Sequence, residues 1–78
     1  MLVRACVLFR TERGRFDEVA DRMKQFKEVK KVFAVLGRYD VVADLEGESF
    51  ESLGKVIIRM GKIGGVVFTE TLVEVEKS

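Results

Sequence analysis

The chain has 78 residues, which is enough for one domain and leaves no room for a second. Fourteen basic and thirteen acidic side chains give a net charge of +1, without the basic excess that nucleic-acid-binding domains usually carry. One cysteine and no histidine exclude an internal disulfide and speak against a structural zinc site. We therefore expect a single domain over residues 1–78, with no metal or cofactor. Small domains without a disulfide or a structural metal often gain stability by forming oligomers.

The N-terminal residues run directly into a strand-like pattern, and their apolar run is too short and too interrupted for a signal peptide. No stretch approaches the roughly 20 apolar residues that a membrane-spanning helix needs. We therefore expect a cytoplasmic protein with a reduced thiol and no membrane partner.

The first third of the chain predicts a strand, a turn and a helix. Residues 2–9 are apolar at both alternating sets of positions, which is typical of a strand covered on both faces. Residues 11–14 predict a turn, and residues 15–27 predict an amphipathic helix. The apolar stripe of this helix consists of Phe16, Val19, Ala20, Met23 and Phe26.

The remainder predicts a hairpin, a second helix and a last strand. Residues 29–36 and 40–46 form two strands that meet at a turn over residues 37–39. Ser49 is the expected N-cap of the second helix, and residues 66–75 form the fourth strand, followed by a tail at residues 76–78. The stripe of the second helix consists of Phe50, Leu53, Val56, Ile57 and Met60.

The predicted element order is therefore βαββαβ. Two right-handed split βαβ units give an α+β fold, a ferredoxin-like plait with a four-stranded antiparallel sheet and both helices on one face. Every predicted strand nevertheless keeps apolar residues on both sides, and soluble monomers rarely expose a bare apolar sheet face. We therefore expect a homodimer that pairs through the face without helices.

The segment Gly37-Arg38-Tyr39-Asp40 places a turn, a cation, an aromatic ring and a carboxylate within four residues. Main-chain N–H groups of a turn suit the carboxylate of a free amino acid, and Asp40 suits its ammonium group. An ordinary turn, with Gly37 at positive φ and the other side chains solvated, explains the same residues. The tetrapeptide alone leaves both interpretations open.

Three stretches taken together carry a resemblance to a known family. They are TERGRFDEVADRMKQF, VFAVLGRYDVVADLEG and IGGVVFTETLVEV. This pattern resembles the C-terminal effector-binding domain of the Lrp/AsnC family, also called the RAM domain, and it covers essentially the whole chain. Its most specific parts are Gly37-x-Tyr39-Asp40 before a β-branched strand and Gly65-Val66 before Thr69-Glu70-Thr71.

The resemblance implies dimers that associate into octamers or other rings and bind a small effector, typically an amino acid, between dimers. In the family the hairpin holds the α-amino and α-carboxylate groups. This implies a site at Gly37, Arg38, Tyr39 and Asp40, and Thr69 and Thr71 are the next expected lining residues.

Family members usually carry an N-terminal helix-turn-helix domain, whereas this chain begins at the first RAM strand. The resemblance therefore points to a stand-alone RAM domain that modulates Lrp/AsnC-type transcription regulators without binding DNA itself. Action alone and action with full-length regulators both stay open.

Other functions of the same topology are less consistent with the residues. An ACT-like amino-acid-binding module shares the fold and the ligand class and remains the nearest alternative. A small plait enzyme lacks support because there is no histidine and Cys6 lies in mid-strand, where an inert thiol is expected. An RNA-binding module needs aromatic residues on its central strands, and Asp44 and Glu46 make the third strand acidic instead. We therefore expect a binding domain that is not an enzyme.

Overall fold

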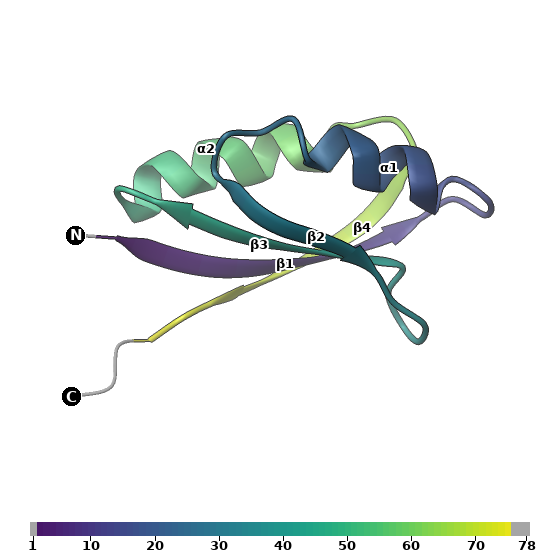
Figure 1. The fold of residues 1–78 in the computed structure, drawn as a ribbon, viewed down its shortest axis with the longest axis horizontal. Coiled ribbons are helices and arrows are strands. Elements are labelled where there is room, and N and C mark those ends of the chain that lie inside the picture. Colours follow the sequence, from purple (N-terminus) through teal and green to yellow (C-terminus); the bar gives the residue numbers. More distant parts are fainter. Residues whose placement is uncertain (1, 76–78) are drawn as a thin grey trace.

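Two helices lie on one side of a four-stranded antiparallel sheet in the computed structural model, which describes residues 2–75 (Figure 1). The strands are β1 (Val3–Thr11), β2 (Val29–Ala34), β3 (Val41–Gly47) and β4 (Val66–Val73), and the helices are α1 (Phe16–Met23) and α2 (Phe50–Gly61). This arrangement confirms the predicted ferredoxin-like βαββαβ fold. The expected tail at residues 76–78 lies outside the described residues.

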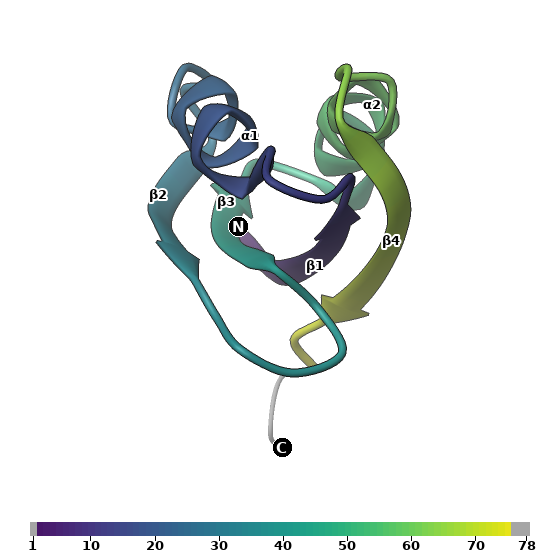
Figure 2. The ribbon, with the colours of Figure 1, turned by 90° about the vertical axis from the view of Figure 1, so that its right-hand side faces the viewer.

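The sheet has the strand order β2-β3-β1-β4, so β1 and β3 are central. Its curvature raises the outer strands β2 and β4 toward the helices, and the concave side holds the core (Figure 2). The alternate residues Val7, Phe9, Val41, Ala43 and Leu45 point to this side and are almost completely buried. Val19 and Met23 of α1 and Leu53, Val56 and Met60 of α2 close the core from above.

Helix α2 begins where the sequence predicts. The Ser49 side chain accepts a hydrogen bond from the Ser52 amide at 3.1 Å, and the Ser52 hydroxyl oxygen accepts one from the Ser49 amide at 3.2 Å. This reciprocal capping box satisfies two N–H groups that a helix N-terminus otherwise leaves unpaired.

Helix α1 ends at Met23, four residues before the predicted end at residue 27. The amides of Gln25 and Phe26 donate to the carbonyls of Arg22 and Met23, three residues back, at 3.2 and 3.3 Å. Side chains three residues apart eclipse one another in such tight turns, so Phe26 stays on the same side as Met23 and packs against the core. Phe26 therefore continues the apolar stripe although it lies after the end of the regular helix.

The strand ends also differ from the prediction. β1 continues to Thr11, where a bulge after Arg10 lets it pair with Val66, and β4 ends at Val73. The β2–β3 connection is a loop over residues 35–40, closed by a hydrogen bond from the Val35 amide to the Asp40 carbonyl at 2.9 Å. It is therefore wider than the predicted turn over residues 37–39, although Gly37 has the expected positive φ, +141°.

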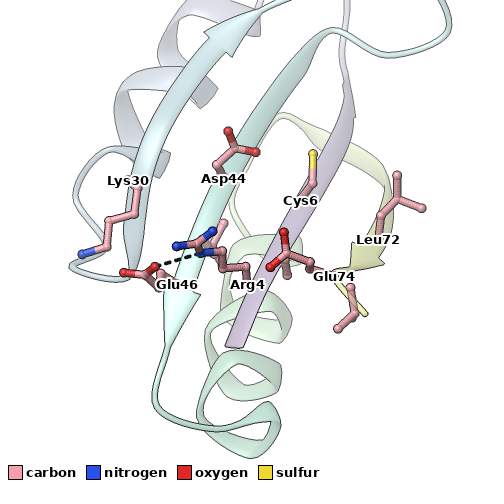
Figure 3. Close-up of a pocket in the computed structure, with 10 residues that line it drawn as sticks. Arg4, Cys6, Lys30, Asp44, Glu46, Leu72 and Glu74 are labelled. Atoms are coloured by element: carbon pink, nitrogen blue, oxygen red, sulfur yellow. Dashed lines mark hydrogen bonds and ion pairs between the residues drawn. The ribbon is translucent and has the colours of Figure 1, made fainter. Parts of the chain in front are cut away.

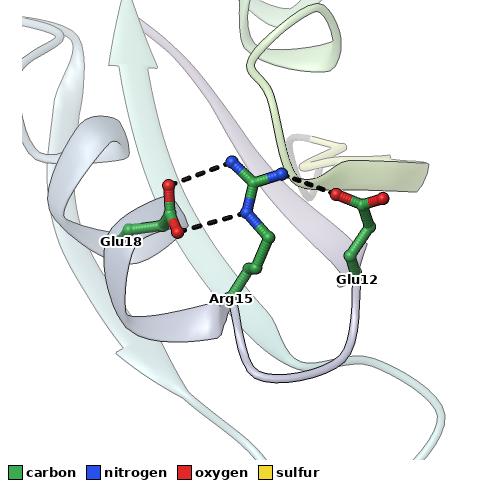
Figure 4. A network of polar contacts seen from close by, with 3 residues as sticks. All are labelled: Glu12, Arg15 and Glu18. Carbon is green, nitrogen blue, oxygen red and sulfur yellow. Dashed lines mark hydrogen bonds and ion pairs between the residues drawn. The ribbon is translucent and has the colours of Figure 1, made fainter.

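Arg15 connects the β1–α1 turn to the start of α1 (Figure 4). Its guanidinium donates to Glu12 Oε1 at 2.6 Å and to both carboxylate oxygens of Glu18 at 3.0 and 3.1 Å. These charge-assisted bonds lower the pKa of the Glu18 carboxyl, chiefly through the Arg15 hydrogen bonds. The same turn is held to the α2–β4 turn by a hydrogen bond from the Glu12 amide to the Gly65 carbonyl at 2.7 Å.

Gly65 and Gly14 provide a matched test of this packing. Both have positive φ, +100° and +80°, but an added Cβ at Gly65 would lie 3.0 Å from Val19 Cγ2, whereas at Gly14 it would meet nothing within 4 Å. We expect Gly14→Ala to lower the free energy of unfolding by roughly 1–2 kcal/mol through backbone strain alone. Gly65→Ala should cost at least about 1 kcal/mol more because of the added steric conflict. Urea unfolding of both variants measures the difference, and equal losses would contradict the proposed contact.

Candidate functional site

The face of the sheet without helices, called the open face below, carries rows of side chains that cross all four strands. One row is apolar over three strands, because Val42 of β3 pairs with Phe33 of β2 and with Leu8 of β1. The fourth member of this row is Glu70 of β4. Phe33 is 38% exposed, and Phe68 and Leu72 of β4 are about half exposed on the same face. The open face therefore combines apolar and charged groups.

The 35–40 loop reaches across one end of this face toward β4 (Figure 2). The Tyr39 hydroxyl donates a hydrogen bond to the Glu70 carboxylate, and this bond is the main reason why the pKa of Tyr39 is raised above its usual value. The rings of Tyr39 and Phe68 stack with centroids 6.4 Å apart. The hairpin therefore rests on the outward-facing residues of β4.

Arg10 completes this contact. Its guanidinium carbon lies 5.8 Å from the centre of the Phe68 ring, and its Nε donates to the Arg38 carbonyl at 3.3 Å. We call the five residues Arg10, Arg38, Tyr39, Phe68 and Glu70 the hairpin cluster. The hairpin cluster places cations, aromatic rings and a carboxylate at the 35–40 loop, which contains the Gly37-Arg38-Tyr39-Asp40 segment.

Asp40 has a structural contact in addition to its position in the loop. Its Oδ2 accepts hydrogen bonds from the Thr11 amide at 2.7 Å and from the Thr11 hydroxyl at 3.3 Å, and its amide donates to the Phe9 carbonyl at 2.8 Å. This carboxylate oxygen therefore holds the end of β1. The other oxygen, Oδ1, accepts no hydrogen bond within residues 2–75.

Thr69 and Thr71 lie on the opposite side of the sheet from the hairpin cluster. They pair with Phe9 and Val7, whose side chains belong to the core, and a Cβ at Gly61 of α2 would lie 4.0 Å from Thr69 Cγ2. Within one protomer the structure thus brings Tyr39 against Phe68 and Glu70 of β4 and not against the two threonines, whereas Asp40 and the Arg38 carbonyl contact β1. Sequence reasoning missed Phe68 and Glu70, although the alternation in β4 separates them from Thr69 and Thr71.

A hollow of about 540 Å³ occupies the other end of the open face (Figure 3). The ion pair between Arg4 Nε and Glu46 Oε2, at 3.1 Å, lies along it. Cys6 also lines it, and partial burial, together with the neighbouring Asp44 carboxylate, raises the pKa of the thiol. A protonated thiol is a poor nucleophile, which agrees with the inert role expected for Cys6.

Metal-binding clusters and membrane-spanning helices are both absent from the part of the chain that the structure describes. Residues 2–75 hold no group of three or more His, Cys, Asp or Glu side chains placed to bind a metal ion. Neither α1 nor α2 is long and apolar enough to cross a bilayer.

The fold and the hairpin cluster together define a small ferredoxin-like domain with a polar loop at the end of an uncovered sheet. Residues 4–77 match the family model described as the Lrp/AsnC ligand binding domain. The chain therefore belongs to this family of regulatory domains, which is related to transcription regulators.

Similar proteins agree with this family. The chain is 29% identical over 69 residues to the HTH-type transcriptional regulator FL11 of Pyrococcus furiosus, and the match covers 88% of this chain and 46% of the regulator. The chain thus spans about half the length of the curated relatives that it matches.

Two solved structures match over nearly their whole length. TTHA0845 from Thermus thermophilus has a TM-score of 0.91 at 28% identity, and the match covers 97% of this chain and 96% of that one. PHS023 from Pyrococcus horikoshii has a TM-score of 0.88 at 26% identity, with coverages of 99% and 93%. Both structures therefore consist almost entirely of this fold.

Tyr39 is the only tyrosine of the chain, so its ionisation is measurable without interference. The hydrogen bond to Glu70, aided by the negative charge of that carboxylate, favours the neutral phenol and raises the pKa of Tyr39. We expect Glu70→Gln to lower this pKa toward the ordinary value, as measured by tyrosinate absorbance during alkaline titration. Glu74→Gln on the same side of the sheet is the control and should leave it unchanged. An unshifted titration curve in Glu70→Gln would show that the hairpin does not rest on β4.

Proposed function

We propose that this domain binds a free amino acid at the 35–40 loop and transmits binding through its assembly, without chemistry on the ligand. The observation that carries the proposal is the pairing of the loop amides with Asp40. The main-chain N–H groups of residues 36–39 donate no hydrogen bond within the described part of the chain, and the adjacent Asp40 keeps Oδ1 without a partner there. A zwitterion needs such donors for its carboxylate and such an acceptor for its ammonium.

The hairpin cluster supports this assignment. Arg38 and Arg10 add positive charge near the loop amides, and the stacked rings of Tyr39 and Phe68 offer an apolar surface for a ligand side chain. Gly37 permits the backbone bend that exposes the amides. Thr69 and Thr71 face the helix layer, so they would have to approach the ligand of a neighbouring protomer rather than that of their own.

We propose that a second copy covers the open face. The apolar row of Phe33, Val42 and Leu8 runs across three strands, and helices already occupy the opposite face. Dimers then associate into octamers or other rings, with the loop at the contact between dimers. A ligand that binds one assembly better than another shifts the population by mass action.

A role in transcription follows from the same assembly. FL11 is a regulator in which the matching region makes up about half of the length. We propose that the present chain modulates regulators of this type, either by its own effector response or by mixing with full-length members, and that it contacts no DNA itself. Native mass spectrometry of a mixture with a full-length family member tests the second route.

The ligand site is tested with Asp40→Asn. This change keeps an acceptor for the Thr11 amide but removes the charge that attracts an ammonium, so the fold should persist. We expect amino-acid affinity to fall at least tenfold, measured by calorimetry with the best ligand from a thermal-shift screen of the twenty amino acids. Thr11→Val is the control, since it removes the 3.3 Å hydroxyl contact and leaves the carboxylate. Unchanged affinity in Asp40→Asn would refute the assignment.

The dimer is tested with Phe33→Glu, which places a charge in the apolar row. We expect the dimer dissociation constant to rise at least tenfold in analytical ultracentrifugation, because burying an unpaired carboxylate is costly. Ile58→Glu is the matched control: Ile58 is 62% exposed and lies on α2, on the other side of the sheet. A wild-type chain that sediments as a monomer at micromolar concentration would overturn the proposed pairing.

A further inference from the structure

A second hollow, of about 510 Å³, lies in the helix layer, away from the open face. It forms where the last turn of α1 and the tight turn after it meet the end of α2. Arg22 and Gln25 line it from α1 and the turn that follows, and Arg59, Lys62 and Ile63 line it from the end of α2 and the connection after it. The half-buried ring of Phe26 forms part of its apolar wall.

The charge of this hollow is one-sided. Three cations, Arg22, Arg59 and Lys62, line it, and no carboxylate of residues 2–75 does. None of the three forms an ion pair within residues 2–75, whereas Arg4, Arg15 and Lys24 each do. Two acidic groups of α1 have partners outside the hollow: Glu18 pairs with Arg15 at 3.0 Å, and Asp21 pairs with Lys24 at 3.8 Å.

Arg59 is positioned before any ligand arrives. Its guanidinium carbon lies 5.3 Å from the centre of the Phe26 ring, which limits the freedom of a long exposed side chain. Stacking uses the face of a guanidinium and leaves its in-plane N–H donors available for a bidentate contact with an anion.

Helix dipoles explain only part of this arrangement. A cation in the last turn of each helix complements the partial negative charge there, and Arg22 and Arg59 occupy such positions. That interaction is local to each helix and does not require the two helices to direct their cations to one hollow. A ligand would explain why cations from both helices, Arg22 and Arg59, line the same hollow.

We propose that this hollow is a binding site for a small polyanion that carries at least two linked phosphate groups. Two guanidinium groups and one ammonium group match such a ligand in charge and in hydrogen-bond donors, and the volume falls within the range of small-molecule sites. Duplex DNA fits less well, because it requires a stripe of phosphate contacts and Asp17, Glu18 and Asp21 make the rest of α1 acidic. The three cations are solvent-exposed, so binding should weaken as salt is added.

Calorimetric titration of the full chain with inorganic pyrophosphate at low salt tests the proposal. We expect saturable binding with one site per chain and an affinity at least tenfold weaker in Arg22→Gln/Arg59→Gln. Lys24→Gln/Lys55→Gln removes two charges from the same two helical regions outside the hollow and should stay within twofold of the wild type. Should the arginine double variant fail to fold, Lys62→Gln carries the test with an expected loss of several-fold.

Two results would overturn the site. One is the absence of saturable pyrophosphate binding to the wild-type chain, and the other is an equal loss in both double variants, which would mean a general effect of net charge. A short DNA duplex that binds through the same arginines, with pyrophosphate failing to bind, would replace the small polyanion with DNA. Saturating amino acid should not displace pyrophosphate, so this test stands or falls independently of the effector site.

Discussion

Within residues 2–75, the two helices cover one face of the sheet and leave the other face without a helix. Because β1 and β3 are central, their inward side chains form the core with α1 and α2, and their outward side chains end up on the open face. Val42 shows the consequence: it points away from the helices and is still only 7% exposed, because Leu8 and Phe33 flank it across the strands. Because one face is covered by helices and the other is not, the 35–40 loop can lie across the open face and contact β4.

The 35–40 loop depends on that uncovered face. A tight two-residue turn would end at the edge of the β2–β3 pair, whereas the wider loop reaches β4 and places Tyr39 against Phe68 and Glu70. Asp40 anchors the other side of the loop by its bonds to Thr11. The loop is thus held at both sides, while the amides between these anchors donate no hydrogen bond within the described residues. This is the arrangement on which the proposed carboxylate contact rests.

Hydrophobic spacing predicted the element order, the fold class and the N-cap of α2, because these depend on local patterns. It predicted too long a helix α1, because the spacing between Met23 and Phe26 is compatible with a tight turn as well as with a helix. It also could not say which alternating set of β4 shares a face with the loop. That depends on the register Phe9↔Thr69 and on the bulge after Arg10, which are pairings between distant residues. The family resemblance implied Thr69 and Thr71, whereas Phe68 and Glu70 are the neighbours of the loop within one protomer.

The two candidate binding regions use opposite sides of one sheet. A copy seated on the open face would leave the helix-layer hollow accessible, so occupation of one region does not sterically exclude the other. The α2–β4 connection leads from one region to the other: Ile63 in this connection lines the hollow, and Phe68 and Glu70 in β4 hold the hairpin. Between these points, Gly65 packs against Val19 and Arg15 with almost no free space. The α2–β4 turn is therefore packed directly on α1, whereas its connection to the hairpin runs along β4 and, through the hydrogen bond from the Glu12 amide to the Gly65 carbonyl, along β1.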